Sequence, residues 1–238
     1  MKKEIPNLLT LGNLLAGCIG LWFVMQGDLV SASYCIFISL VCDFFDGFLA
    51  RALQAYSDLG KELDSLADMV SFGVLPAFIL FSLVEQSCGS QCTVGIFGFY
   101  KPFMVFALAL MSAYRLAKFN IDTRQSDQFI GVPTPANGLL VASLPLILHF
   151  QPEFSLYILH FKGLLIYSIV MSYLLVAEFP LMAFKFKSWG WVANQMRYLF
   201  LIYCVAILLL LKFAAFPILV VSYIVLSFIL SLLNIKQK

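Results

Sequence analysis

Residues 43–68 read DFFDGFLARALQAYSDLGKELDSLAD and carry a set of spaced aspartates inside an otherwise apolar chain. The pattern is Asp43-x2-Asp46-Gly47-x2-Ala50-Arg51-x8-Gly60-x3-Asp64-x3-Asp68. Ionised groups are costly at bilayer depth, so several of them together usually face a cavity and serve a function. On a helix, spacings of three and four residues place each pair of aspartates on one face. The stretch therefore predicts two helices that each present two carboxylates to a divalent-cation site.

Composition places most of the chain in a membrane. Of its 238 residues, 62% are hydrophobic and 12% are charged, whereas soluble domains carry roughly 25% charged residues. The net charge of +2 is too small to indicate a nucleic-acid partner. The first apolar run lacks the pattern of a cleavable signal peptide, so we expect it to remain as a span.

Apolar runs of about 20 residues, the length that spans a bilayer, recur along the chain. We predict an all-α polytopic membrane helix bundle with about eight transmembrane helices. They are expected near residues 7–26, 29–52, 62–84, 101–120, 136–150, 154–177, 196–212 and 215–234. The last two could instead form one tight hairpin that does not fully cross the membrane.

The distribution of lysine and arginine predicts the orientation of these spans. With the N-terminus inside, twelve basic residues fall on the inner side and three on the outer side. The inner set is Lys2, Lys3, Arg51, Lys61, Arg115, Lys118, Arg124, Lys185, Lys187, Arg197, Lys236 and Lys238, and the outer set is Lys101, Lys162 and Lys212. This bias predicts an inner-membrane protein whose termini and acidic motif are cytoplasmic.

Four carboxylates near one point repel one another strongly where the dielectric constant is low. One or two divalent cations would remove that repulsion, since otherwise some of the carboxylates would take up protons. Ligands that are all oxygen favour Mg²⁺, Mn²⁺ or Ca²⁺ over zinc, and Mg²⁺ is commonly shared between carboxylates and substrate phosphates. The motif therefore indicates chemistry on a phosphate group.

Small residues accompany the acids and would let a bulky ligand approach the backbone. They are Gly47, Ala50 and Gly60. Arg51 could meet a phosphate as a bidentate donor. The competing interpretation is helix packing, because membrane helices use small residues at their interfaces.

The whole pattern resembles, at every position and spacing, the signature of the CDP-alcohol phosphatidyltransferase family. The resemblance implies transfer of a phosphatidyl group from a CDP-linked donor to an alcohol, with release of CMP. It also implies two divalent ions, Mg²⁺ or Mn²⁺, on Asp43, Asp46, Asp64 and Asp68. Asp68 would be the general base, with Asp64 beside it in the catalytic site. Gly47, Ala50, Arg51 and Gly60 would line the CDP part of the donor. At the start of the first span, Asn7 and Thr10 could reach the nucleotide or diphosphate, or could be capping residues at the interface.

The acceptor alcohol must be recognised by other segments, because the signature reads the donor. YRLAKFN (114–120) and GVPTPANG (131–138) resemble the phosphatidylserine synthase branch of the family. Arg115, Lys118 and Asn120 could bind the carboxylate of serine, with Thr134 in the second segment, although snorkelling explains Lys118 equally well. Lys118 stands where that branch commonly has arginine, which puts a bidentate clamp in doubt.

The resemblance implies that CDP-diacylglycerol and L-serine give phosphatidylserine, in a homodimer. We expect the serine hydroxyl to attack directly, because no serine, cysteine or histidine of the chain stands out as a covalent nucleophile. Attack by one of the carboxylates on the phosphorus stays open as an alternative first step. Another acceptor, glycerol 3-phosphate or inositol phosphate, could use Arg115, Lys118 and Arg124. An ion-coupled transporter is the distant alternative, but it predicts acids spread across the membrane depth. We expect a six-span family core at 1–180 and a two-helix extension of unassigned role at 181–238. Cys88 and Cys92 form either a disulfide or two free thiols.

Overall fold

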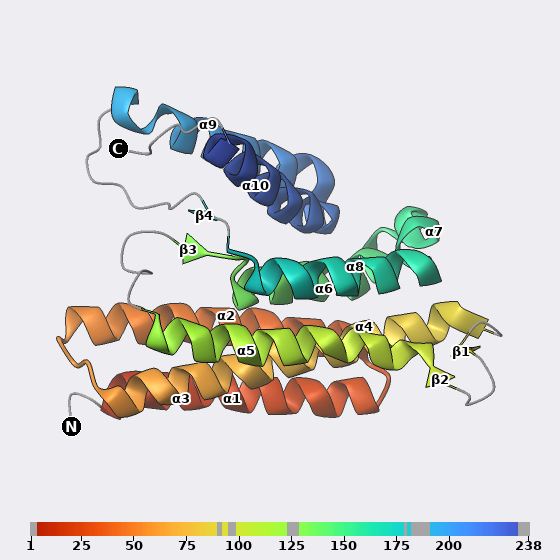
Figure 1. The fold of residues 1–238 in the computed structure, drawn as a ribbon, viewed down its shortest axis with the longest axis horizontal. Helices are drawn as coiled ribbons and strands as arrows, with labels where there is room; N and C mark the ends of the chain where they lie inside the picture. The colour runs from red at the N-terminus through yellow and green to blue at the C-terminus, as the bar shows by residue number, and fades with distance from the viewer. Residues whose placement is uncertain are drawn as a thin grey trace.

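Two long helices open the fold and run side by side in opposite directions (Figure 1). The structure is a computed structural model that describes residues 4–89, 92–94, 99–122, 129–178, 180–181 and 191–232. After helix α1 (Glu4–Met25) the chain turns at Gly27, whose φ is +78°, and enters α2 (Leu29–Ala52). The Asp28 carboxylate accepts a hydrogen bond from the Ser31 backbone N–H at 3.0 Å and so caps α2.

The next helical segment changes its hydrogen-bonding pattern partway along. It comprises α3 (Asp58–Asp68), the π-helix η1 (Met69–Val74) and α4 (Leu75–Cys88). The Ser57 hydroxyl accepts from the Gly60 backbone N–H at 3.0 Å and caps α3. Pro76 lacks an N–H and cannot join the regular helical ladder, which accounts for a widened turn just before it. The acidic end of the segment is thereby offset from its apolar end.

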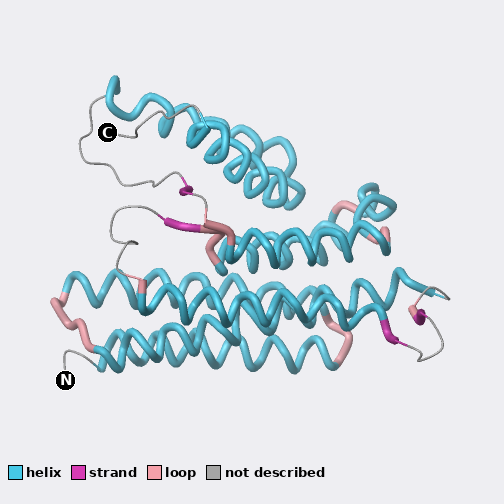
Figure 2. Tube along the Cα trace, viewed as in Figure 1, coloured by secondary structure: helices cyan, strands magenta, loops and turns pink. Residues whose placement is uncertain are grey.

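The other elements are shorter, and the strands are only two residues long (Figure 2). They are, in order, β1 (Thr93–Val94), β2 (Phe99–Tyr100), η3 (Lys101–Phe106), α5 (Ala107–Ile121), β3 (Phe129–Ile130), α6 (Thr134–Phe150), η5 (Pro152–Phe154), α7 (Ser155–Ile158), α8 (Phe161–Val176), β4 (Pro180–Leu181), α9 (Trp191–Leu211), η6 (Lys212–Ala214) and α10 (Ala215–Leu232). β1 pairs with β2 and β3 with β4, both antiparallel, in the registers Thr93↔Tyr100 and Phe129↔Leu181. The predicted all-α class is confirmed.

The helices form successive layers. In Figure 1 the helices α1 to α5 make one layer, α6 and α8 lie above it, and α9 with α10 lie outermost. Small residues permit close approach within and between these layers: within the first layer a Cβ on Gly17 would lie 3.1 Å from Ser71 Cα, and between layers one on Gly138 would lie 3.1 Å from Phe72 Cδ1. Phe72 is fully buried in the apolar core. The N-terminal end of α6 is thus placed close to η1, just beyond the acidic motif.

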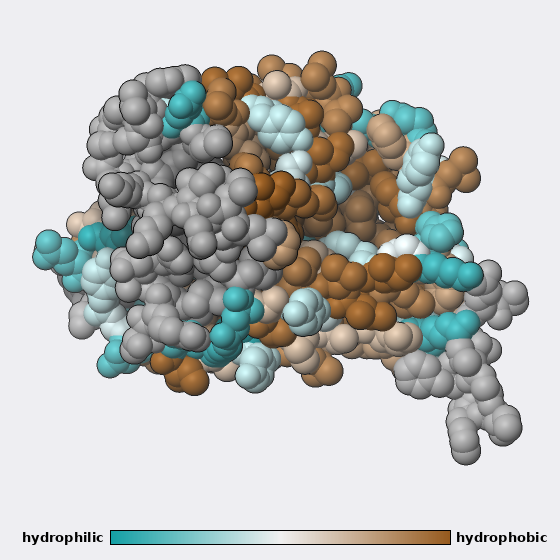
Figure 3. Space-filling model, turned by 45° about the horizontal axis from the view of Figure 1, so that its top comes forward, coloured by the Kyte–Doolittle hydropathy of each residue, from teal (hydrophilic) through white to brown (hydrophobic). Residues whose placement is uncertain are grey.

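The chain is an integral membrane protein. Within the described residues, five helical segments are long and apolar enough to cross a membrane, or six if α6 and the bent continuation at Pro152–Ile158 count as one span. Figure 3 shows hydrophobic residues concentrated between two ends where more of the hydrophilic residues gather. The count of eight spans stays a prediction, since α8 is a shorter apolar helix and Tyr198–Ile229 is counted as a single segment.

The C-terminal helices fold back on each other and are tied to the preceding layer. The hydroxyl groups of Tyr203 and Ser222 lie 3.0 Å apart between α9 and α10. Gln151 donates to the Leu211 carbonyl at 3.1 Å and accepts from the Ala214 backbone N–H at 3.0 Å. A single buried amide therefore holds the break between these two helices.

At the end of the molecule opposite the acidic motif, Cys88 and Cys92 form a disulfide. Of the two alternatives for these cysteines, the structure has the bonded one. Several basic residues that carried the orientation argument lie outside the described residues, namely Lys2, Lys3, Arg124, Lys185, Lys187, Lys236 and Lys238. The orientation therefore remains a prediction.

Candidate functional site

Three of the four motif aspartates converge where α2 meets α3. One carboxylate oxygen from each of Asp43, Asp64 and Asp68 lies within 4.8 Å of the other two. Asp68 is 7% exposed, and the other two are half-buried. Asp64 Oδ1 is buried and has no hydrogen-bond partner among the described residues. Three converging oxygen ligands, one of them unsatisfied, fit a divalent cation.

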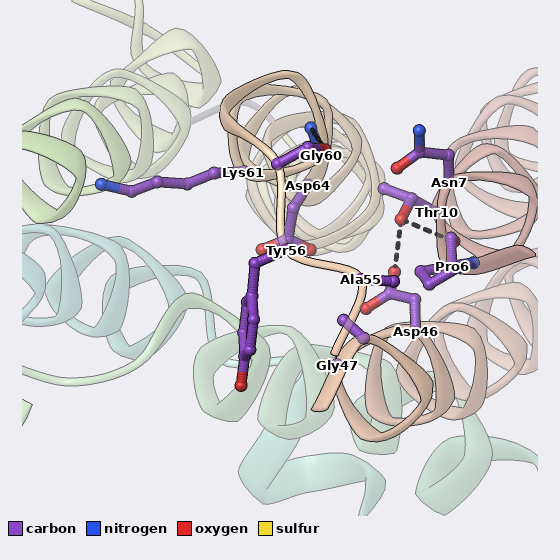
Figure 4. Close-up of a pocket in the computed structure, with 12 residues that line it drawn as sticks. Pro6, Asn7, Thr10, Asp46, Gly47, Ala55, Tyr56, Gly60, Lys61 and Asp64 are labelled. Atoms are coloured by element: carbon purple, nitrogen blue, oxygen red, sulfur yellow. Dashed lines mark hydrogen bonds between the residues drawn. The ribbon is translucent and has the colours of Figure 1, made fainter. Parts of the chain in front are cut away.

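The fourth aspartate occupies a different environment. Asp46 Oδ2 accepts a hydrogen bond from the Thr10 hydroxyl at 2.7 Å, and the same hydroxyl lies 3.1 Å from the Pro6 carbonyl (Figure 4). Asp46 is 6% exposed and does not belong to the three-carboxylate group found among the described residues. The structure thus joins Asp46 to α1 and to the neighbouring pocket.

That pocket is a cavity of about 180 Å³ between α1, α2 and α3. Most of the predicted donor-binding residues line it, and Figure 4 shows them around one space. They are Asn7, Thr10, Gly47, Ala50 and Gly60. Tyr56 and Lys61 also line the cavity and were not predicted; Tyr56 lies in the short link between the two acidic helices and Lys61 in the first turn of α3, beside Gly60.

Gly60 lines this pocket, whereas Arg51 is not among the lining residues and lies next to one of them, Gly47. A Cβ on Gly47 would lie 3.5 Å from Arg51 Nη1, so the guanidinium folds back over the glycine one turn earlier. A Cβ on Gly60 would lie 3.0 Å from Ser57 Oγ and 3.1 Å from Asn7 Oδ1. The glycine at position 60 therefore keeps the space between α1 and α3 open.

On the other side of the acids, Arg115 reaches in from α5. Its side chain is 8% exposed, its Nη2 lies 3.5 Å from the Gly131 carbonyl, and it interacts electrostatically with Asp68. Gly131 has φ +71°, and a Cβ there would lie 2.7 Å from the Leu175 carbonyl. Only glycine fits that turn, which leads directly into Thr134, a fully buried residue at the start of α6.

The two other predicted acceptor residues bridge neighbouring elements. Lys118 Nζ lies 2.6 Å from Glu178 Oε1, in a pair whose side chains are 29% and 56% exposed. The Asn120 side chain donates to Ser65 Oγ at 2.9 Å, and the Asn120 backbone carbonyl accepts from Lys61 Nζ at 2.6 Å. Both residues therefore hold the C-terminal end of α5 against its surroundings.

Asn13 is a site residue that the predicted set lacked. Its side-chain amide donates to Asp68 Oδ1 at 3.0 Å, and the residue is fully buried. Ser39 Oγ donates to the Asn13 carbonyl at 3.1 Å, which fixes α1 against α2 at this level. The signal was available, because Asn13 follows Thr10 by three residues and so shares its helix face.

Comparison with known proteins agrees with this geometry. The sequence model of a family described as CDP-alcohol phosphatidyltransferase matches residues 3–184. A CDP-diacylglycerol–serine O-phosphatidyltransferase of Bacillus subtilis is 35% identical over 144 residues, which cover 59% of this chain and 74% of that protein. Enzymes with the same name from Helicobacter pylori and Methanocaldococcus jannaschii are 37% and 33% identical, over 57% and 58% of this chain. The matches span 54% and 58% of those two proteins, little more than half their length.

Proposed function

This chain belongs to the CDP-alcohol phosphatidyltransferase family, and on that premise we propose that it transfers a phosphatidyl group from CDP-diacylglycerol to the hydroxyl of L-serine, giving phosphatidylserine and CMP. The observation that carries the proposal is the position of Asp68. It lies in the carboxylate cluster and also interacts with the buried cation Arg115. The carboxylates proposed to handle phosphate and the arginine proposed to bind the amino acid therefore both act on Asp68.

Members of this family use divalent metal ions, and we propose Mg²⁺ or Mn²⁺ here, two ions in all. Asp43, Asp64 and Asp68 would hold them, with Asp46 completing the set from the pocket side. When bound, such ions neutralise charge on the diphosphate and on the departing CMP.

The donor would occupy the cavity beside Asp46. Asn7 and Thr10 offer polar atoms from α1, while Gly47, Ala50 and Gly60 leave the backbone of α2 and α3 accessible. Arg51, at the edge above Gly47, would pair with a phosphate oxygen. The diacylglycerol part would extend from the site into the bilayer.

In the reaction, Asp68 accepts the proton of the serine hydroxyl, with Asp64 beside it. The serine oxygen then forms a bond to the phosphorus that carries diacylglycerol, and the bond from that phosphorus to the oxygen of CMP breaks. Arg115 and Thr134 would bind the serine carboxylate, with Lys118 and Asn120 at the rim of the site. Attack by an aspartate on the phosphorus is the alternative first step.

Phosphorylated acceptors are the nearest alternative, because they keep the chemistry and change only the alcohol. Such an acceptor requires several cations beside Asp68. Arg115 is buried there, whereas Lys118 pairs with Glu178 and Arg124 lies outside the described residues. This arrangement favours serine over glycerol 3-phosphate or inositol phosphate. An ion-coupled transporter is disfavoured, because three of the carboxylates converge at one point and are not spread across the membrane depth.

We further propose an inner-membrane homodimer with cytoplasmic termini and active site. The six-span core would comprise 1–180 and the extension 181–238. The start of α1, the end of α10 and the β3–β4 pair lie toward the same end of the molecule as the start of α3 in Figure 1, in keeping with one common side for all of them.

The test is acceptor-dependent release of CMP. Purified protein in detergent is supplied with CDP-diacylglycerol, Mn²⁺ and one alcohol at a time: L-serine, glycerol 3-phosphate or inositol phosphate. We expect CMP and phosphatidylserine with serine and only background CMP with the others. CMP release that depends on a phosphorylated acceptor and not on serine would refute the assignment of serine.

A further inference from the structure

Three buried side chains around Asp68 each have a polar atom with no hydrogen-bond partner among the described residues. These atoms are Asn13 Oδ1, Arg115 Nε and Thr134 Oγ1. The residues are 0%, 8% and 0% exposed. Buried polar atoms are nearly always paired, and an unpaired one carries a desolvation penalty. Three such atoms around one carboxylate therefore indicate a place that a polar ligand fills.

The three side chains come from three helices and reach the same level of the bundle. Asn13 on α1 contacts Asp68 directly at 3.0 Å, and Arg115 on α5 interacts with it electrostatically. Thr134 begins α6 one turn before Gly138, and Gly138 packs on Phe72, one turn after Asp68. The helices α6 and α3–α4 run in the same direction in Figure 1, and with Gly138 against Phe72 this sets the first turn of α6 level with the last turn of α3.

The three atoms differ in whether they can donate or accept a hydrogen bond. The Asn13 amide N–H is committed to Asp68, which leaves its carbonyl oxygen as a pure acceptor. Arg115 Nε can only donate, and the Thr134 hydroxyl can do both. An acceptor next to a carboxylate on the α1 side and donors on the α5–α6 side match a ligand with a positive group and a negative group.

We propose that Asn13 is a specificity-determining residue that binds the ammonium group of the amino-acid acceptor through Oδ1, on the opposite side of Asp68 from the carboxylate subsite of Arg115 and Thr134. This inference rests on the proposed function and deepens it. It gives the acceptor class as a zwitterionic amino acid whose hydroxyl lies beside Asp68. The donor motif alone does not contain this information, because none of its residues supplies the three unpaired atoms.

Two fragments of serine test the ammonium side and the carboxylate side of the proposed acceptor site separately. Ethanolamine keeps the ammonium and hydroxyl but lacks the carboxylate, and 3-hydroxypropionate keeps the carboxylate and hydroxyl but lacks the ammonium. The inhibition constant of each fragment is measured against serine-dependent CMP release, for the wild type and for Asn13→Leu and Arg115→Met. Leucine has the same branching at Cγ as asparagine, although it is larger, and it has no polar side-chain atom. Ser33→Ala is the control, since Ser33 is fully buried and bonds only to the Leu29 carbonyl in its own helix.

We expect Asn13→Leu to raise the inhibition constant of ethanolamine by about tenfold or more, because the ammonium group loses a hydrogen bond to Oδ1. The inhibition constant of 3-hydroxypropionate, which has no ammonium group, should stay within about twofold of the wild-type value. Arg115→Met should show the reverse pattern. Equal weakening of both fragments by Asn13→Leu would overturn the proposal, since Asn13 would then act only by holding Asp68.

A second variant and a second measurement keep the test decisive if Asn13→Leu does not fold or does not turn over substrate. Asn13→Ser keeps a small hydroxyl that can accept a hydrogen bond from the ammonium, so it should restore part of the ethanolamine binding. Calorimetric titration of each fragment into protein loaded with CDP and Mn²⁺ reports binding without catalysis. The same crossed pattern is required there, in which Asn13→Leu weakens the binding of ethanolamine only and Arg115→Met weakens the binding of 3-hydroxypropionate only. If the wild type uses serine and the crossed pattern is absent, only this inference fails. If the wild type binds neither fragment and does not use serine, the proposed function fails as well.

Discussion

The two sides of the acidic cluster are built in different ways. On the donor side, residues of α1, α2 and α3 line one cavity, and their polar atoms are largely paired, as Thr10 is with Asp46 and Ser57 with Gly60. On the acceptor side, Arg115 and Thr134 come from α5 and α6 and retain unpaired atoms. Apart from Asp64 Oδ1, the unpaired buried atoms near Asp68 therefore lie outside the cavity, on the side proposed for the acceptor.

The largest effect is expected where the two sides meet, at Asp68. Asp68→Asn removes the proton acceptor and a cation ligand with almost no change of shape, so kcat for CMP release should fall by roughly 10² to 10⁴-fold. Asp58→Asn, on the same helix but exposed, is the matched control and should stay near the wild type. Full activity of Asp68→Asn in Mg²⁺ or Mn²⁺ would remove Asp68 from the chemistry.

Gly60→Ala tests the steric limit of the donor side. The new methyl group would meet Ser57 Oγ and Asn7 Oδ1 at 3.0 and 3.1 Å, and overpacking of this kind costs about 1–3 kcal/mol. We expect KM for CDP-diacylglycerol to rise by roughly tenfold or more, with KM for serine unchanged. Gly12→Ala, whose methyl group would lie 3.6 Å from Cys42 Sγ, serves as the tolerated counterpart. A normal KM for the donor in Gly60→Ala would show that the donor does not need this space.

Thr10→Val tests the polar pairing of the donor side without changing its volume. The variant leaves Asp46 without the hydroxyl that it accepts from at 2.7 Å. Hydrogen bonds to charged groups contribute about 1.5–3 kcal/mol, so kcat/KM for CDP-diacylglycerol should fall by about tenfold. Thr10→Ser, which keeps the hydroxyl, should recover most of that loss. If valine and serine variants behave alike, the hydrogen bond has no part in donor binding.

The smallest effect is expected at the rim of the acceptor side. Lys118 pairs with Glu178 in a partly exposed position, and such pairs contribute about 0–1 kcal/mol. Lys118→Met should therefore raise KM for serine by less than about fivefold, much less than Arg115→Met does under the same conditions. A loss at Lys118 as large as that at Arg115 would extend the carboxylate subsite outward to the rim.

Sequence spacing predicted which motif residues come together and most of the residues that line the neighbouring cavity, but it did not predict every contact of Asp68. Asp64 and Asp68 share a helix face, as helical periodicity predicts, and Asp43 joins them from α2. Asp46 has the same periodicity but is drawn toward α1 by Thr10, a contact between residues 36 positions apart. Asn13 was missed for the same reason, since its partner Asp68 lies 55 positions away in the chain. Contacts of that separation depend on how whole helices dock.

The sequence by itself determined the membrane class, the family signature and which residues share a helix face, because composition and a period of 3.6 residues are local properties. Only the tertiary structure decided which faces meet. Gly17 against Ser71 and Gly138 against Phe72 set the depth at which α1 and α6 approach the motif helix. Side-chain packing determines those depths, and they bring Asn13, Arg115 and Thr134 level with Asp68. The proposed acceptor site therefore depends on helix packing, whereas the motif alone predicts the donor site.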